Sequence, residues 1–388
     1  MYRLLSRPRL AVAITCALTT LGLVSAVGAD TASAGTVRAP NLGAALRTPI
    51  AYVVVGNGGG HDVYPVNTRT NKVGKPINVG PFALRVVASP DGRFVYASSL
   101  NGVTVIRTAT NKVSKVIRLA GGVSRLVLDP QRRTVYAPSN KGIVPISTSS
   151  NTAGRPFAGR QDEIAVTPNG RWLFAFQRNA NTVTQINLAT HKRVAQINVG
   201  MNPVAVTSSP DSKKAYVASF ATTGSFGGQV VPITIATGHA GKPVPVGNDP
   251  VDLTISPDGK TLYVADNVTG VYTIRTATMS PGPVIPAGDG SVFIAIPPGG
   301  KYAYVANAFD SFISTVNIAK NTAGPNIRVG PGPQMIAFTP DGKKAYVPNV
   351  GLHGGPNGYT VTPINTVTNA SGKGIHVAIF PSYITIAP

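Results

Sequence analysis

Histidine is the side chain best suited to metal binding or proton transfer near neutral pH, and this chain has only five. His61, in GNGGGHD, and His353, in GLHGGPNG, each lie in a glycine-rich segment after an apolar run. Asp62 follows His61 directly, so two imidazoles and a carboxylate are candidates for a metal or acid–base site. The alternative interpretation is that all three are solvated loop residues.

Four aspartates form a second candidate site, because Ca²⁺ prefers carboxylate and other oxygen ligands. The residues are Asp249, Asp266, Asp289 and Asp310. Their spacing matches no known calcium loop, and Asp is also common in turns. We therefore expect no cofactor, and calcium is the cation that these aspartates would suit.

Several catalytic classes lack their sequence signatures. Glu163 is the only glutamate and Trp172 the only tryptophan, and there is no Cys-x-x-Cys-His or Gly-x-Ser-x-Gly motif. These absences favour a binding protein over an enzyme, and the enzyme question stays open.

The segments that carry these side chains belong to an internal repeat. The phrase SPDGRFVYASS at Ser89 recurs as SPDSKKAYVAS, SPDGKTLYVAD and TPDGKKAYVPN. Its aromatic residue recurs at gaps of 44, 40, 38, 42, 47, 41 and 42 residues, at Tyr52, Tyr96, Tyr136, Phe174, Tyr216, Tyr263, Tyr304 and Tyr346. A spacing of about 42 residues with short β-prone runs is typical of propeller blades of four strands.

A second repeated turn, represented by NTRTNKVGKPI at 67–77 and NTVTNASGKGI at 365–375, separates the third and fourth strands of each unit. The chain begins, after a linker, with a second strand (IAYVVVGN) and ends with a first strand (PSYITIAP, 381–388). We therefore predict an all-β, eight-bladed propeller whose ring is closed by the C-terminal strand joining the N-terminal blade.

The segments AYVVVGN, LYVADN, AYVANA and AYVPNV, with TNxxG turns between them, resemble the YVTN-repeat β-propeller family of secreted and surface-layer proteins from bacteria and archaea. The resemblance covers about residues 49–388 and implies a propeller fold. It leaves two other functions open: a lactonase-like or lyase-like enzyme acting on a small molecule, and a structural surface-layer component.

The N-terminus has the pattern of an export signal. Three arginines precede an uncharged run from Leu10 to Ala29, and Ala32-Ser33-Ala34 has the form of a cleavage site. We predict a signal peptide over 1–34, a linker over 35–48 and a propeller over 49–388, with no transmembrane segment after cleavage. The expected product is a secreted monomer, extracellular or associated with the cell wall.

Charge is distributed unevenly along the repeat. The chain carries 35 Lys and Arg against 14 Asp and Glu, a net charge of +21. An antiparallel meander places the Pro-Asp-Gly and Thr-Asn-Gly turns on one face, the turn face, and the other connections on the opposite loop face. The turn face holds 21 cations and five carboxylates. Its candidate ligand-binding residues are Lys213, Lys214, Lys343, Lys344, Arg132, Arg133, Lys192 and Arg193.

This face is expected to attract an anionic cell-wall polymer or surface component. No element that could read nucleic-acid bases is apparent, so specific nucleic-acid binding is not expected. The alternative is that the cations only keep exposed turns soluble.

Overall fold

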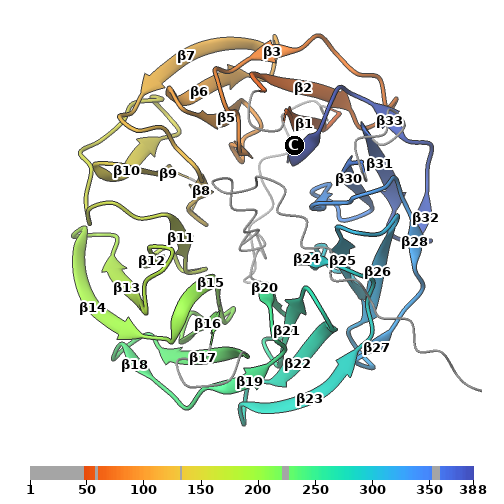
Figure 1. Cartoon of the computed structure of the whole chain (residues 1–388). Coiled ribbons are helices and arrows are strands. Elements are labelled where there is room, and N and C mark those ends of the chain that lie inside the picture. Colours follow the sequence, from red (N-terminus) through yellow and green to blue (C-terminus); the bar gives the residue numbers. More distant parts are fainter. Residues whose placement is uncertain (1–47, 57–59, 132, 221–226, 352–358) are drawn as a thin grey trace, which may run out of the picture.

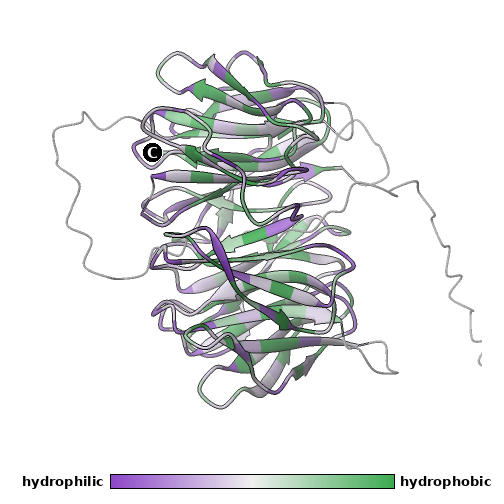
Figure 2. Cartoon of the chain, turned by 90° about the vertical axis from the view of Figure 1, so that its left-hand side faces the viewer, coloured by the Kyte–Doolittle hydropathy of each residue, from purple (hydrophilic) through white to green (hydrophobic). Residues whose placement is uncertain are grey.

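The computed structural model of the chain describes residues 48–388 except 57–59, 132, 221–226 and 352–358. Its strands form eight antiparallel sheets that stand as blades around a ring (Figure 1). Seen from the edge, the ring is a disc with apolar residues along the strands and hydrophilic residues toward the turns (Figure 2). This arrangement confirms the predicted eight-bladed β-propeller. Nearly all of the predicted signal peptide and linker lies outside the described residues.

Each blade has the predicted strand order from the ring axis outward. The first strands are β34 (Pro381–Ala387), β4 (Val86–Ala88), β8 (Val127–Leu128), β11 (Glu163–Val166), β15 (Met201–Ser208), β20 (Pro250–Ile255), β24 (Ser291–Ala295) and β29 (Ala337–Phe338). The second strands, which carry the repeated aromatic, are β1 (Ile50–Val55), β5 (Phe94–Ser99), β9 (Thr134–Ser139), β12 (Trp172–Phe176), β16 (Lys214–Phe220), β21 (Thr261–Asp266), β25 (Tyr302–Asn307) and β30 (Lys344–Val350).

The third strands are β2 (Asp62–Asn67), β6 (Gly102–Arg107), β10 (Gly142–Ser147), β13 (Thr182–Asn187), β17 (Gly228–Thr234), β22 (Gly270–Arg275), β26 (Phe312–Asn317) and β31 (Tyr359–Asn365). The outer strands are β3 (Ile77–Asn78), β7 (Lys112–Arg118), β14 (Lys192–Asn198), β18 (His239–Ala240), β19 (Val244–Val246), β23 (Ser280–Ile285), β27 (Thr322–Ala323), β28 (Ile327–Arg328), β32 (Ala370–Ser371) and β33 (Ile375–His376). The third blade has only two isolated bridges in this position, Ile143 with Phe157 and Ile146 with Ala153.

The outer edge of several blades is interrupted where a glycine crosses a proline of the third strand. The Gly74 amide donates to the Pro65 carbonyl at 2.8 Å, and Gly372 donates to Pro363 in the same way. A Cβ on Gly74 would lie 2.9 Å from Cγ of Pro65, so no larger residue fits there without a shift. Proline also has no N–H to give the outer strand at this point. In the fifth and eighth blades, where this contact occurs, the fourth strand is split into two short segments, β18 with β19 and β32 with β33.

The ring is closed within one sheet. The C-terminal strand β34 pairs antiparallel with β1, from Ile50 opposite Ala387 to Val55 opposite Pro381, with one irregularity near Val55. The sheet order β3-β2-β1-β34 therefore combines both ends of the propeller in a single blade. The predicted closure is confirmed.

A repeated hydrogen bond joins neighbouring blades at five of the eight junctions. The hydroxyl of Tyr304, in the seventh blade, donates to Oδ1 of Asn369 in the Thr-Asn-Gly turn of the eighth at 2.6 Å. Equivalent bonds run from Tyr52 to Asn111 at 2.7 Å, Tyr96 to Asn151 at 2.5 Å, Tyr263 to Asn321 at 2.6 Å and Tyr346 to Asn71 at 3.0 Å. Burial raises the pKa of Tyr304 to about 12, so its hydroxyl keeps its proton at any ordinary pH.

The asparagines that accept these bonds share a left-handed backbone, with φ between 51° at Asn321 and 57° at Asn71. Asn is one of the few non-glycine residues that tolerates this conformation. The junction after the fourth blade differs: its aromatic is Phe174, which has no hydroxyl, and the corresponding turn residue is Gly238, with φ of 65°. At this junction the donor and the acceptor are both absent. At two others the tyrosine is kept but the turn residue is His191 or Met279 in place of asparagine, again with a left-handed backbone.

Removal of the closing strand should open the ring. Deletion of residues 381–388 leaves β1 without its inner partner and exposes the edge of that strand. We expect a lower thermal midpoint, a less cooperative transition and association between chains, measured by calorimetry and light scattering. A truncated chain that kept both the midpoint and the monomeric state would contradict the closure.

The hydroxyl–amide bonds should show energetic coupling. Tyr304→Phe and Asn369→Gly each remove one partner, and each should lower the free energy of unfolding by about 1 kcal/mol. The double variant recreates the Phe174–Gly238 junction, so its loss should be smaller than the sum of the two by roughly 0.5 kcal/mol or more. Denaturant unfolding of the four proteins measures this difference.

The matched control combines Tyr304→Phe with Asn71→Gly, whose own partner is Tyr346 in another junction. These two changes should be additive. Equal coupling in both pairs would show that the effect does not come from the hydrogen bond.

Candidate functional site

The two kinds of turn lie together on one face of the disc. Oγ1 of Thr108, in a Thr-Asn-Gly turn, donates to the carbonyl of Gly92, in the Pro-Asp-Gly turn of the same blade, at 2.5 Å. Thr276 and Gly259 make the same contact at 2.7 Å. The two kinds of turn of a blade are therefore neighbours on the face deduced from the strand order.

The carboxylates of the turn face serve the turns themselves. Oδ1 of Asp341 accepts the hydroxyl of Thr339 at 2.6 Å and the amide of Lys343 at 3.1 Å. These hydrogen bonds, the Thr339 hydroxyl foremost, lower the pKa of Asp341, so the group stays ionised. Asp91, Asp211 and Asp258 accept equivalent bonds from the serine two residues earlier, each at 2.6 Å.

The predicted basic residues of the turn face fall into three groups. The first group, Lys213, Lys343, Arg133 and Lys192, has exposed side chains, and within the described structure only Lys213 of these four has an ion pair, with Asp211 of its own turn at 3.5 Å. The next three are also exposed but contribute to the turns: Lys344 Nζ donates to the Thr68 carbonyl of the first blade at 2.9 Å, Lys214 Nζ donates to Thr234 at 2.8 Å, and Arg193 donates to the Ala158 carbonyl at 3.3 Å. Arg132 lies outside the described residues.

Few of these cations are neutralised by a neighbouring acid. Among the described residues of the turn face, ion pairs within 4.0 Å join Arg93 to Asp91, Lys213 to Asp211 and Lys260 to Asp258. All three involve the Pro-Asp-Gly turns. The sequences of the eight Thr-Asn-Gly turns contain no carboxylate at all. The cations of those turns, such as Lys72, Lys112 and Lys192, form an outer basic ring.

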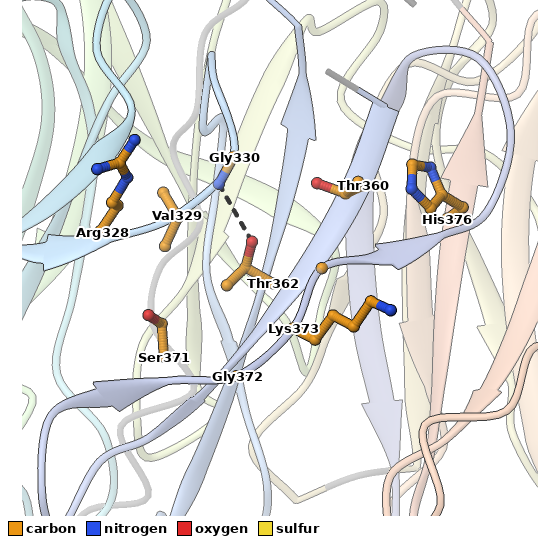
Figure 3. A pocket seen from close by; sticks show the side chains of 10 residues that line it. Arg328, Val329, Gly330, Thr360, Thr362, Ser371, Gly372, Lys373 and His376 are labelled. Atoms are coloured by element: carbon orange, nitrogen blue, oxygen red, sulfur yellow. Dashed lines mark hydrogen bonds between the residues drawn. The ribbon is translucent and has the colours of Figure 1, made fainter. Parts of the chain in front are cut away.

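Two hollows adjoin this basic surface. One, of about 460 Å³, lies between the outer strands of the seventh and eighth blades (Figure 3). Arg328, Lys373 and His376 line it, with no carboxylate among its lining residues. Its wall is held by the Gly330 amide, which donates to Thr362 Oγ1 at 3.2 Å. The other, of about 400 Å³, lies between Arg133 and Arg171 on the turn face.

The loop-face histidine site is only partly visible. His61 is exposed, and its carbonyl accepts the Val79 amide at 2.7 Å; Asp62 begins β2. His353 lies outside the described residues. Within the described ranges, no three His, Cys, Asp or Glu side chains form a group that could hold a metal ion. The described parts of the chain also contain no helix long and apolar enough to cross a membrane.

The four aspartates of the calcium hypothesis shape loops. Asp266 is fully buried, and its oxygens accept the amides of Asp249 at 2.8 Å and Thr269 at 2.9 Å. Asp310 accepts the amide of Asp289 at 2.7 Å in the same way. These contacts give Asp266 and Asp310 a structural role, and calcium binding stays a prediction.

Sequence reasoning missed a cluster of charged side chains around the ring axis. Nη1 of Arg125, just before β8, lies 2.5 Å from Oε2 of Glu163 in β11, and both side chains are about 95% buried. Nη2 of Arg178, from the loop after β12, lies 3.2 Å from the other oxygen of Glu163. The guanidinium of Arg85, just before β4, stacks 4.3 Å from the ring centre of Tyr383 in β34. We call these residues, with Asp252 of β20, the axial cluster.

Asp252, in β20, is fully buried. Its Oδ2 accepts the Ile294 amide at 3.0 Å, whereas Oδ1 has no hydrogen-bond partner among the described residues. Burial raises the pKa of this carboxyl well above its ordinary value, although Arg125 and Arg85 are near enough to oppose the shift. Burial likewise lowers the pKa of Arg85.

A signal for the axial cluster was present in the repeat. One position of the repeat lies five residues before the proline that follows each first strand. In five blades this position holds a polar or charged residue: Arg85, Arg125, Glu163, Asp252 or Tyr383. The other three blades have Ala205, Phe293 and Met335 there. Aligning this column would have shown polar residues where a buried strand normally has apolar ones. Their convergence required the closed ring.

Asp252 should make stability fall as pH rises. A carboxyl with a raised pKa in the folded state binds more protons there than in the unfolded chain, so its stabilising effect is lost from its ordinary value of 3.8 upward through the raised pKa. Asp252→Asn keeps an oxygen acceptor for the Ile294 amide without the charge. We expect this variant to unfold at a higher temperature than the parent at pH 8 and to lose this part of the pH dependence. An unchanged profile between pH 4 and 8 would contradict the assignment.

Comparison with known proteins identifies the fold without a function. No family model matches the chain, and no curated protein matches it in sequence. Among solved structures, it resembles the dihydro-heme d1 dehydrogenase NirN in complex with DHE, with a TM-score of 0.69 and 18% identity over 95% of this chain and 78% of that one. It also resembles Kuenenia stuttgartiensis hydrazine synthase, with a TM-score of 0.57 and 18% identity over 76% of this chain and 96% of that one. At this identity the likeness extends to the propeller fold, and the YVTN-repeat resemblance remains an interpretation of the sequence.

Proposed function

We propose that this protein is a secreted, non-catalytic binding scaffold that attaches to anionic polymers of the cell wall or cell surface through its turn face. The observation that carries the proposal is the outer basic ring: exposed cations recur in the Thr-Asn-Gly turns, and those turns contain no carboxylates. Solubility alone requires charged residues at turns but does not require one sign.

The geometry suits an extended polymer better than a compact ligand. The cations are spread over successive blades, and the hollow bearing Arg328, Lys373 and His376 is placed to take one anionic group of a chain that passes over the rim. Many weak contacts of this kind derive affinity from counterion release, so binding depends strongly on salt. The loop face offers no comparable concentration of exposed cations in the sequence.

Retention on anionic wall material should identify the binding face. The triple variant Lys72→Glu, Lys112→Glu and Lys192→Glu changes exposed residues for which no ion pair is found in the described structure. It should weaken binding about tenfold or more at low salt, and the parent should weaken at least about tenfold between 50 and 200 mM salt. Lys344 and Lys214 are unsuitable, because their ammonium groups support the turns.

The control is Arg118→Glu, Lys141→Glu and Arg160→Glu, which makes the same change in net charge among exposed loop-face residues. This variant should bind nearly as well as the parent. Equal losses in the two variants, or binding that ignores salt, would show that the turn face is not a binding surface.

A further inference from the structure

The junction between the third and fourth blades departs from the repeat. Its tyrosine is Tyr136, and the turn residue of the fourth blade is His191 in place of asparagine, with the same left-handed backbone at φ of 58°. The His191 ring stacks on Phe157, with the ring centres 4.1 Å apart and the planes 3° from parallel. Phe157 makes a T-shaped contact with Tyr136, at 6.2 Å between ring centres. The Tyr136 hydroxyl therefore has no asparagine oxygen to which it can donate.

The hollow between Arg133 and Arg171 lies at this junction. Tyr136 lines it together with Asn187 and Leu188, which belong to the same fourth-blade turn as His191. Burial, and to a smaller extent the nearby Asp129, raises the pKa of Tyr136 to about 12, so its hydroxyl stays protonated as a donor. The volume of about 400 Å³ is in the range of sites for small organic ligands.

The Pro-Asp-Gly turn of the third blade has also changed. Asp129 occupies the position that holds serine or threonine in five other blades, and Gln131 replaces the carboxylate two residues later. The Asp129 side chain lines the hollow, is mostly buried, and accepts the Arg133 amide at 3.3 Å. Among the described residues it has no ion-pair partner within 4.0 Å. The third blade thus brings a carboxylate into the wall of the hollow, whereas other blades engage theirs with a hydroxyl of the same turn.

The lining residues combine positive charge with a donor and an acceptor. Arg133 and Arg171 are exposed and directly precede the second strands of adjacent blades, β9 and β12. A guanidinium binds phosphate or carboxylate oxygens through two parallel N–H donors. A bare anion would also meet the carboxylate of Asp129, which repels it. A ligand that carries hydroxyl groups as well can donate to Asp129 and accept from Tyr136.

We propose that this hollow is a binding site for a hydroxyl-bearing anion, a sugar or polyol unit that carries a phosphate or a carboxylate. Arg133 and Arg171 bind the anionic group, while Tyr136 and Asp129 bind the hydroxyls. The site rests on the proposed function for the source of its ligand, which is one unit of the anionic polymer that crosses the turn face. It gives that polymer a fixed register on the ring, which the similar lysines of the outer basic ring do not.

The competing explanation is that the stacking of His191 on Phe157 merely replaces the usual hydrogen bond as a packing contact. The variant His191→Asn separates the two explanations, because it supplies Tyr136 with the acceptor found at five other junctions. If the junction only serves packing, this change affects stability alone. If the hollow is a binding site, the change also weakens ligand binding, because the hydroxyl is engaged within the protein.

The experiment is isothermal titration of the full chain at constant ionic strength set with sodium chloride. Glucose 6-phosphate and glucuronate are the two probes, and glucose and inorganic phosphate each carry only half of the required chemistry. We expect at least one probe to bind the parent, and both half-ligands to bind about tenfold more weakly or worse. The tighter of the two probes identifies the anionic group as phosphate or carboxylate.

The variants test the assigned roles. Arg171→Gln should weaken binding of the probe about tenfold or more, since it removes a charged donor, and Tyr136→Phe and His191→Asn should each weaken it several-fold. The matched control is Arg93→Gln, which changes the residue equivalent to Arg133 in the second blade, where the junction keeps its Tyr96–Asn151 bond. This control should bind as the parent does.

The proposed site is refuted if neither probe binds the parent, if a half-ligand binds as tightly as the probes, or if Arg171→Gln leaves binding unchanged. Because its side chain is exposed, Arg171→Gln decides even where Tyr136→Phe fails to fold. Retention on wall material without binding of either probe would remove this site and leave the outer basic ring standing. Binding of a probe without retention on wall material would support the site and contradict the proposed function.

Discussion

The ring depends on the hydrogen bonds that five buried tyrosines donate to an asparagine in the turn of the next blade. A propeller blade cannot bury both faces of its sheet alone, so every junction between blades must be filled and its polar groups satisfied. The tyrosine ring fills the junction while its hydroxyl reaches the asparagine, as between Tyr304 and Asn369. The bond from Tyr346 to Asn71 joins the last blade to the first, where β34 also completes the first sheet. Closure therefore depends on side-chain contacts as well as on strand pairing.

The same turns determine the charge of one face. The left-handed asparagine directs its side chain into the junction, and the residue that follows it is left exposed. In three blades that following residue is a lysine: Lys72 after Asn71, Lys112 after Asn111, and Lys192 after His191, which has the same left-handed backbone. The basic character of the turn face is consequently tied to the repeat that builds the fold, while the carboxylates of the other turns are engaged by their own serine or threonine.

The residues at the ring axis do not follow the repeat. One position of each first-strand segment lies toward the centre of the ring. The repeats are similar elsewhere, but the residue at this position varies between blades and includes Arg85, Arg125, Glu163, Asp252 and Tyr383. Ionisable groups taken from water lose hydration free energy that a single salt bridge seldom restores. The loss of symmetry at this one position distinguishes the axis from the rest of the scaffold.

The sequence alone determined the architecture, because the spacing of its aromatics, the alternation of its turns and the unmatched first strand at its C-terminus are local and repeated features. It also predicted the basic turn face, since sidedness follows directly from strand order. It could not pair Tyr304 with Asn369, because the repeat marks both residues without showing which blades meet. Nor could it gather Arg85, Arg125, Glu163 and Asp252, which are separated by up to 167 positions in the chain. Only ring closure brings such residues together, and only burial in the closed ring shifts the pKa values of Arg85 and Asp252, so the axial cluster was decided by the tertiary structure.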